Sequence, residues 1–132
     1  MKTQFSTSWI SSSQPRKQRK YRYEAPLHIK HKFLSAHLSK ELRAKHKIRS
    51  LPIIVGDEVL VMRGTFAKKK GKVAKVYLRR SKVTVEGITR KKIDGSKLNV
   101  YLDPSKLQVI TLKTDDKRRL ISGEAKDAQH KK

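Results

Sequence analysis

Short apolar runs alternate with glycine-rich and charged turns through the middle of the chain. Five runs have the length and composition of strands: Val59–Met62, Gly71–Leu78, Val83–Val85, Leu98–Leu102 and Leu107–Leu112. Turn signals separate them, including Asp94-Gly95, a pair that favours a β-hairpin. Short strands at roughly ten-residue spacing are typical of a small β-barrel. The pattern predicts a mostly β domain over residues 51–112, with its core formed by Val59, Val61, Val73, Val76, Val83, Val85, Leu107 and Val109.

The segments on either side lack this alternation. Residues 1–23 have no sustained apolar period, and Pro15 disfavours a helix, so we expect an extended basic arm. Residues 24–50 are expected to link arm and barrel through a turn, a short helix from Ile29 to Ala36, and a second helix capped by Ser39. Residues 113–132 predict a short C-terminal helix capped by Thr114, in which Leu120 and Ile121 pack inward, followed by a tail.

Charge decides the class of partner. The chain has 34 Lys and Arg against 11 Asp and Glu, a formal net charge of +23. Self-repulsion from such an excess opposes folding, and the usual compensation is a polyanion. Nucleic acid is favoured because each neutralised phosphate releases counterions. A membrane is disfavoured, because no apolar stretch approaches the ~20 residues of a spanning helix. The absence of cysteine excludes disulfides and thiolate metal sites, and no secretory signal is recognised, so an intracellular location is expected.

The net positive charge is largest in the first fifty residues, because few acids accompany the cations there. Residues 1–50 carry 13 cations and 2 anions, residues 51–112 carry 14 and 5, and residues 113–132 carry 7 and 4. In residues 1–23 cations alternate with tyrosines, a pattern that suits phosphate contacts together with base stacking. The predicted RNA-binding residues of the arm and linking segment are Arg16, Lys17, Arg19, Lys20, Tyr21, Arg22, Tyr23, His28, Lys30, His31, Lys32, Arg43, Lys45 and Arg49. Those of the barrel are Arg63, Lys68, Lys69, Lys70, Lys72, Arg79 and Arg80.

One stretch has a recognisable pattern. Gly56-Asp57-Glu58-Val59-Leu60-Val61-Met62-Arg63-Gly64, followed by Gly71-Lys72-Val73, resembles a KOW motif with its turn glycines Gly64 and Gly71. The flanks include Gln14-Pro15-Arg16-Lys17-Gln18-Arg19-Lys20, Ala25-Pro26-Leu27-His28, Leu38-Ser39-Lys40-Glu41-Leu42-Arg43, Arg49-Ser50-Leu51-Pro52 and Pro104-Ser105-Lys106. With them, roughly residues 14 to 121 resemble the archaeal and eukaryotic form of the large-subunit ribosomal protein L twenty-four family. Members of that family usually have a second glycine where this chain has Ala67-Lys68, and the first thirteen residues match no family pattern.

The resemblance implies an SH3-like barrel and a structural role in the large ribosomal subunit, hence a cytoplasmic protein. It implies binding to the 5′ region of the large-subunit rRNA near the polypeptide exit tunnel, contacts with neighbouring ribosomal proteins, and a part in early subunit assembly. The compact KOW loop and short tail favour an archaeal source over a eukaryotic one. The alternatives are a KOW-domain transcription-elongation factor, a chromatin-type DNA binder and an RNase.

Catalysis and metal binding find little support in the residues. His28, His31 and His37 lie near one another in sequence, but few carboxylates and no cysteine accompany them. The paired acids Asp57-Glu58 and Asp115-Asp116 stand at a turn and at an expected helix start, where hydrogen bonding and the helix dipole explain them. We therefore expect no enzyme, no cofactor, no metal and no small-molecule substrate.

Overall fold

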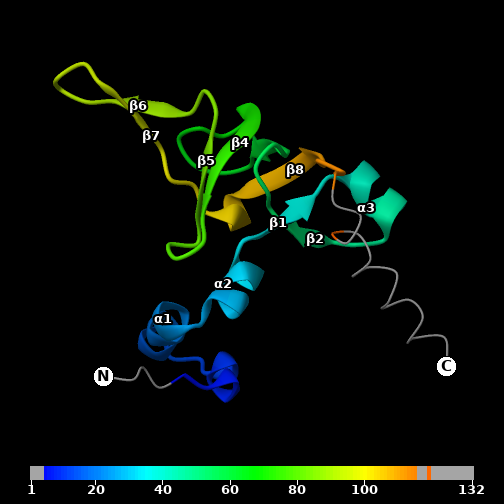
Figure 1. Cartoon of the computed structure of the whole chain (residues 1–132), viewed down its shortest axis with the longest axis vertical. Coiled ribbons are helices and arrows are strands. Elements are labelled where there is room, and N and C mark those ends of the chain that lie inside the picture. Colours follow the sequence, from blue (N-terminus) through cyan, green and yellow to red (C-terminus); the bar gives the residue numbers. More distant parts are fainter. Residues whose placement is uncertain (1–4, 116–118, 120–132) are drawn as a thin grey trace.

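The computed structural model describes residues 5–115 and Arg119, and its centre is a six-stranded sheet (Figure 1). The strands of the sheet lie in the order β2-β1-β8-β3-β4-β5. Their bounds are β1 Ser35–Leu38, β2 Ser50–Pro52, β3 Glu58–Val61, β4 Lys70–Tyr77, β5 Lys82–Val85 and β8 Leu107–Thr111. All neighbours are antiparallel except β1 and β8, which run parallel. A two-stranded hairpin, β6 Thr89–Lys91 and β7 Lys97–Asn99, projects from the sheet.

The helices are short and most precede the sheet in the chain. The N-terminal part contains η1 Thr7–Ser11, α1 Pro15–Glu24 and α2 Leu27–Phe33, and Figure 1 shows them together beyond one end of the sheet. Helix α3, Lys40–His46, follows β1 on another side, and η2, Pro104–Lys106, precedes β8. The Ser39 side chain accepts a hydrogen bond from Leu42 N–H, which confirms Ser39 as the predicted cap of α3.

The predicted extended arm is wrong for residues 15–24, which form a helix. Pro15 is the first helical residue, where its missing N–H costs nothing and its fixed φ suits the helix. The restriction that proline imposes falls on the residue before it, and Gln14 is accordingly extended with φ −77° and ψ 121°. The predicted helix from Ile29 to Ala36 is also shorter than expected, since Ser35–Leu38 is a strand that pairs with β2 and β8.

The core confirms most of the predicted apolar positions. Seven of the eight predicted residues are buried, and Val76 is partly buried against them. A bulge between Val73 and Lys75 shifts the register of β4, so that Val73 pairs with Val85 whereas Val76 pairs with Val83. The core also holds residues that the pattern missed, from β1, β2 and the loops: Leu34, Ala36, Leu38, Leu51, Ile53, Ile88 and Leu102.

The described part of the chain is mostly β, as predicted, but its strands do not close into a barrel. The edge strands of the sheet are β2 and β5, and they are not paired with each other. On the β5 side the ladder continues only through a single bridge, in which Val83 and Leu102 exchange two backbone hydrogen bonds of 3.0 and 2.8 Å. The expected Leu98–Leu102 strand is divided: Leu98 and Asn99 belong to β7 and pair with β6, whereas Leu102 makes the isolated bridge to Val83.

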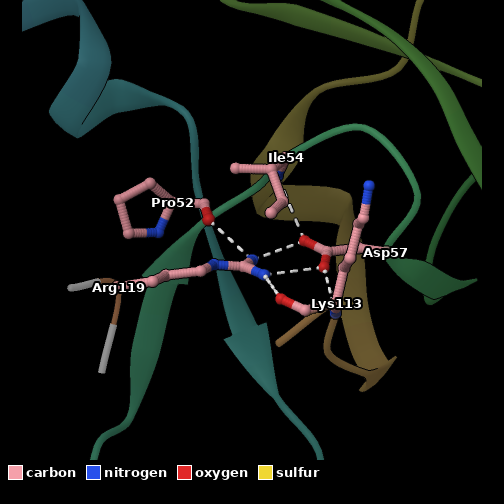
Figure 2. A network of polar contacts seen from close by, with 5 residues as sticks. All are labelled: Pro52, Ile54, Asp57, Lys113 and Arg119. Carbon is pink, nitrogen blue, oxygen red and sulfur yellow. Dashed lines mark hydrogen bonds and ion pairs between the residues drawn. The ribbon is translucent and has the colours of Figure 1, made fainter. Parts of the chain in front are cut away.

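A buried ion pair ties residue 119 to the start of β3 (Figure 2). Asp57 is fully buried, and its carboxylate accepts hydrogen bonds from both terminal nitrogens of Arg119 and from the backbone N–H of Ile54 and Lys113. Asp57 was predicted to stand at a turn and to be explained by hydrogen bonding, which these contacts bear out, whereas Arg119 had no predicted role. The rest of the predicted C-terminal helix, including Leu120 and Ile121, lies outside the described residues.

Candidate nucleic-acid interface

A small aromatic cluster fixes the orientation of α1. Tyr21 is buried, and its ring lies 5.1 Å from that of Phe5 and 6.0 Å from that of Phe33. Ala25 and Ile29 are buried in the same cluster, and Trp9 packs against it. The predicted stacking of Tyr21 on RNA bases is therefore wrong, because its ring is covered by the protein itself. The first thirteen residues, which had no assigned role, supply Phe5 and Trp9 to this cluster.

With Tyr21 turned inward, the charged side chains of α1 face solvent. All the cations predicted in this segment are exposed, namely Arg16, Lys17, Arg19, Lys20 and Arg22. Tyr23 is exposed as well, with a side chain that is 80% accessible. The Arg22 guanidinium lies 5.4 Å above the Phe33 ring, which positions it by a cation–π contact. The Gln18 amide donates to three backbone carbonyls, those of Trp9, Ile10 and Ser12.

An open groove of about 1170 Å³ separates α1 and α2 from the turn between β4 and β5. One wall carries Arg19, Arg22 and Lys30 with Tyr23, and the other carries Arg79, Arg80 and Lys82 with Tyr101. We call this feature the basic groove. Its walls hold six cations against the two acids Glu24 and Asp103. The fold thus brings together predicted site residues that lie about sixty positions apart in the chain, with a net positive charge facing an open channel.

The opposite wall of the basic groove is held in place by specific contacts. The Tyr101 ring meets Tyr77 edge to face at 5.0 Å, and the Arg80 guanidinium lies 5.6 Å from the Tyr101 ring. Lys82 donates to Asp103, and this hydrogen bond holds the pKa of the Asp103 carboxyl below its ordinary value, assisted by the charges of Lys106 and Arg22. Asp103 therefore stays ionised and orients Lys82. Neither Lys82 nor Tyr101 was among the predicted site residues, because only the folded structure brings them to the groove beside α1.

The loop between β3 and β4, together with the start of β4, presents a second group of cations. Lys68, Lys69, Lys70 and Lys72 are exposed, and so is Arg63, which donates to the Ser105 carbonyl at 3.1 Å. Gly64 has φ +100°, a conformation that favours glycine. Lys68 has φ +68°, at the point where the family usually has a second glycine. Gly71 is not a turn residue but a point of close approach, since a Cβ there would lie 2.6 Å from the Glu86 carbonyl oxygen.

The remaining predicted residues are more scattered. His28, His31 and Lys32 line a shallow depression between α2 and β2, and Lys45 and Arg49 are exposed near α3. Arg43 is half-buried, which leaves less of its side chain open to phosphate than in the exposed arginines, and its Nε has no hydrogen-bond partner among the described residues. Across residues 5–115 and Arg119, no group of three His, Asp or Glu side chains is placed to hold a metal ion, and no helix is long and apolar enough to span a membrane.

Comparison with known proteins gives consistent matches over most of the chain. Residues 12–122 match the model of the family that comprises the eukaryotic ribosomal protein L26 and its archaeal counterpart L24. Proteins named large ribosomal subunit protein uL24 are similar to it. Those of Methanocella arvoryzae and Methanospirillum hungatei are each 46% identical over 117 residues, covering 89% and 87% of this chain and 94% and 98% of those proteins. The Korarchaeum cryptofilum protein is 43% identical over 114 residues, covering 85% of this chain and 87% of its own length.

Proposed function

Since the chain belongs to the family of eukaryotic L26 and archaeal L24 ribosomal proteins, we propose that its basic groove binds the rRNA of the large ribosomal subunit. The protein is a structural component of that subunit, in cytoplasmic ribosomes, and not an enzyme. It therefore has rRNA and neighbouring ribosomal proteins as partners. The alternative of a KOW-domain elongation factor loses its support, because the matched family is ribosomal across residues 12–122.

The observation that carries the proposal is the convergence of six cations on one open groove. Lysine and arginine on both walls can reach the phosphates of a single RNA segment from two sides. Two exposed tyrosines, Tyr23 and Tyr101, offer ring faces at the same site for an unpaired base. Contacts of this kind recognise the shape of RNA more than its sequence, because most of them go to phosphate and ribose.

The salt dependence of binding tests this mechanism. If about eight phosphates are neutralised, log affinity for large-subunit rRNA falls against log salt with a slope of roughly −6 to −7. Replacing Arg19, Arg22, Arg79 and Arg80 by alanine is expected to flatten that slope by about 3. The same change at four exposed lysines that neither line the groove nor pair with its acids, Lys40, Lys47, Lys75 and Lys113, serves as the matched control. A groove variant that keeps the wild-type slope would contradict the proposal.

The contribution of each wall can be separated by a double-mutant cycle. Arg22→Ala and Arg80→Ala remove one cation from each side of the groove. If both arginines bind the same RNA segment, the double variant loses less affinity than the sum of the single losses, since the segment is already displaced by the first change. Strict additivity would indicate two independent contacts.

The finer features that the family resemblance implies are part of the same proposal. They are an SH3-like barrel as the class of the β domain, binding to the 5′ region of the rRNA, a position near the polypeptide exit tunnel, and participation in early assembly. The order and antiparallel pairing of β3, β4 and β5 support the first of these. Chemical footprinting of the rRNA bound to the full-length protein tests the second, since protection confined to other regions would exclude it.

A further inference from the structure

The β6–β7 hairpin is the most exposed ordered element among the described residues, and the candidate interface above does not use it. Every residue from 89 to 99 is exposed, and the hairpin projects from the sheet (Figure 1). Its ladder pairs Thr89 with Asn99, Arg90 with Leu98, and Lys91 with Lys97. A two-stranded ribbon that lies away from a core is marginal by itself, so its charges and its tip need an explanation.

Cations lie on both faces of the ribbon. Because successive cross-strand pairs point to opposite faces, Arg90 lies on one face with Leu98, and Lys91 and Lys97 lie on the other. The hydrogen bond from Lys92 N–H to Ser96 O continues this alternation by one step, which assigns Lys92 to the face of Arg90. Lys91 and Lys97 are directly opposite each other, an arrangement of like charges that destabilises a hairpin in water. Asp94 is the one acid in the segment 89–99. A polyanion that runs along both faces would remove this repulsion.

The tip presents an apolar side chain on a defined turn. Ile93 is fully exposed, with a relative accessibility of 109%. The turn beneath it is closed by hydrogen bonds from Lys92 N–H to Ser96 O (2.9 Å) and from Gly95 N–H to Lys92 O (3.1 Å). Ser96 donates to Asp94 through both its hydroxyl and its backbone N–H, so the acid is engaged within the turn and holds it in shape. Ile93, Leu98, three cations and Asp94 surround a shallow depression of about 680 Å³.

We propose that this hairpin inserts between two backbone segments of folded RNA, with cations of each face on one segment and Ile93 packed against an exposed base or ribose. The proposal rests on the proposed function, because it takes the RNA to be the large-subunit rRNA. Apolar side chains at the tips of basic elements act as wedges against bases in other nucleic-acid complexes. A protein partner is less well matched, since the two apolar side chains are surrounded by four cations rather than by a continuous apolar surface.

Paired substitutions test whether both faces bind. Arg90→Ala with Lys92→Ala removes the cations of one face, and Lys91→Ala with Lys97→Ala removes those of the other. Each pair is expected to flatten the salt slope of rRNA binding by roughly 1.5. Ile93→Ser is expected to leave the slope unchanged and to weaken binding about fivefold, as for burial of about half of the side chain. The control pair is Lys40→Ala with Lys75→Ala. An effect at only one face, or no more effect than the control, would overturn the proposal.

Proximity to RNA can be measured directly, because the chain contains no cysteine. Ile93→Cys allows a single iron chelate to be attached at the tip, and Lys40→Cys gives the same label at a control position on α3. Hydroxyl radicals from position 93 are expected to cut the bound rRNA at two separated sites that position 40 does not cut. If the protein binds rRNA but radicals from position 93 make no such cuts, the hairpin inference fails while the proposed function stands. The same holds if, in the intact subunit, radicals from position 93 cleave only protein. If the wild-type chain does not bind rRNA, the proposed function fails first.

Discussion

Removal of the Arg119 guanidinium is expected to destabilise the protein more than removal of any exposed arginine. Asp57 is fully buried, and the Arg119 side chain is only 6% exposed. Arg119 also donates to the carbonyls of Pro52 (2.9 Å) and Lys113 (3.1 Å), so it links the end of β2, the start of β3 and the residues after β8 (Figure 2). Arg119→Ala leaves the Asp57 carboxylate buried with two backbone N–H donors and no counter-charge.

The magnitude follows from what remains around Asp57. Removing one partner of a buried ion pair commonly costs about 3–5 kcal/mol. Here the two backbone donors remain, and water can enter the space left by the arginine, so we expect about 2–4 kcal/mol. For a chain of this size that corresponds to a fall in Tm of about 10 °C. Arg119→Lys keeps the charge but loses the paired N–H geometry and is expected to fall between the wild type and Arg119→Ala.

Thermal and urea unfolding of the RNA-free protein, followed by far-ultraviolet circular dichroism, measures these changes. Arg79→Ala is the matched control, because Arg79 is exposed and removing it is expected to change the free energy of unfolding by less than about 0.5 kcal/mol. If Arg119→Ala is no less stable than Arg79→Ala, the ion pair does not hold the end of the sheet, and the reasoning above is wrong.

Three further changes probe single features. Lys68→Gly relieves the left-handed backbone at φ +68° and is expected to raise stability by about 0.5–1 kcal/mol in urea unfolding, whereas Ala67→Gly should not. The lowered pKa of Asp103 means that its ionised form stabilises the fold above the ordinary aspartate pKa of about 3.9, and that this contribution is lost as pH falls through the lower folded value. Asp103→Asn is therefore expected to reduce the difference in the free energy of unfolding between pH 6 and pH 2. An unchanged difference would exclude this contribution. Gln18→Ala removes three hydrogen bonds to residues 9–12 and should shift the fluorescence of Trp9, the sole tryptophan, to longer wavelength, while Gln14→Ala should not.

The strands that were predicted from the sequence are those in which the alternation of apolar and polar residues is visible within the strand itself. Val59 and Val61 on β3 alternate with half-exposed residues and are bounded by turns, so local signals suffice. Strand β1 was missed because it follows α2 after a single residue, and its burial depends on β2 and β8, which come later in the chain. The Asp57–Arg119 contact joins residues 62 positions apart, and no local pattern predicts such a pair.

The interface shows the same division between local and non-local information. Composition and charge runs identified the cations of α1 and those around the β3–β4 loop, and all of them are exposed. The sequence could not indicate that Arg19 and Arg22 face Arg79 and Arg80 across one groove, since this depends on how α1 packs. Tyr21 was assigned to the interface by its local sequence, although the structure buries it. Its position among cations suggested a base-stacking residue, whereas its ring forms the buried contact that orients the helix.

The helical state of residues 15–24 changes how RNA binding by this segment has to be understood. An extended arm would lose conformational freedom at each residue on binding, at a cost of about 1–2 kcal/mol per residue. A ten-residue helix is marginal in isolation, but here Tyr21 is held between Phe5 and Phe33, and Gln18 bonds three carbonyls of the preceding segment. These contacts place Arg19 and Arg22 at the groove in the absence of RNA. The affinity gained from phosphate contacts is therefore offset less by ordering, and the buried tyrosine contributes to binding without touching the RNA.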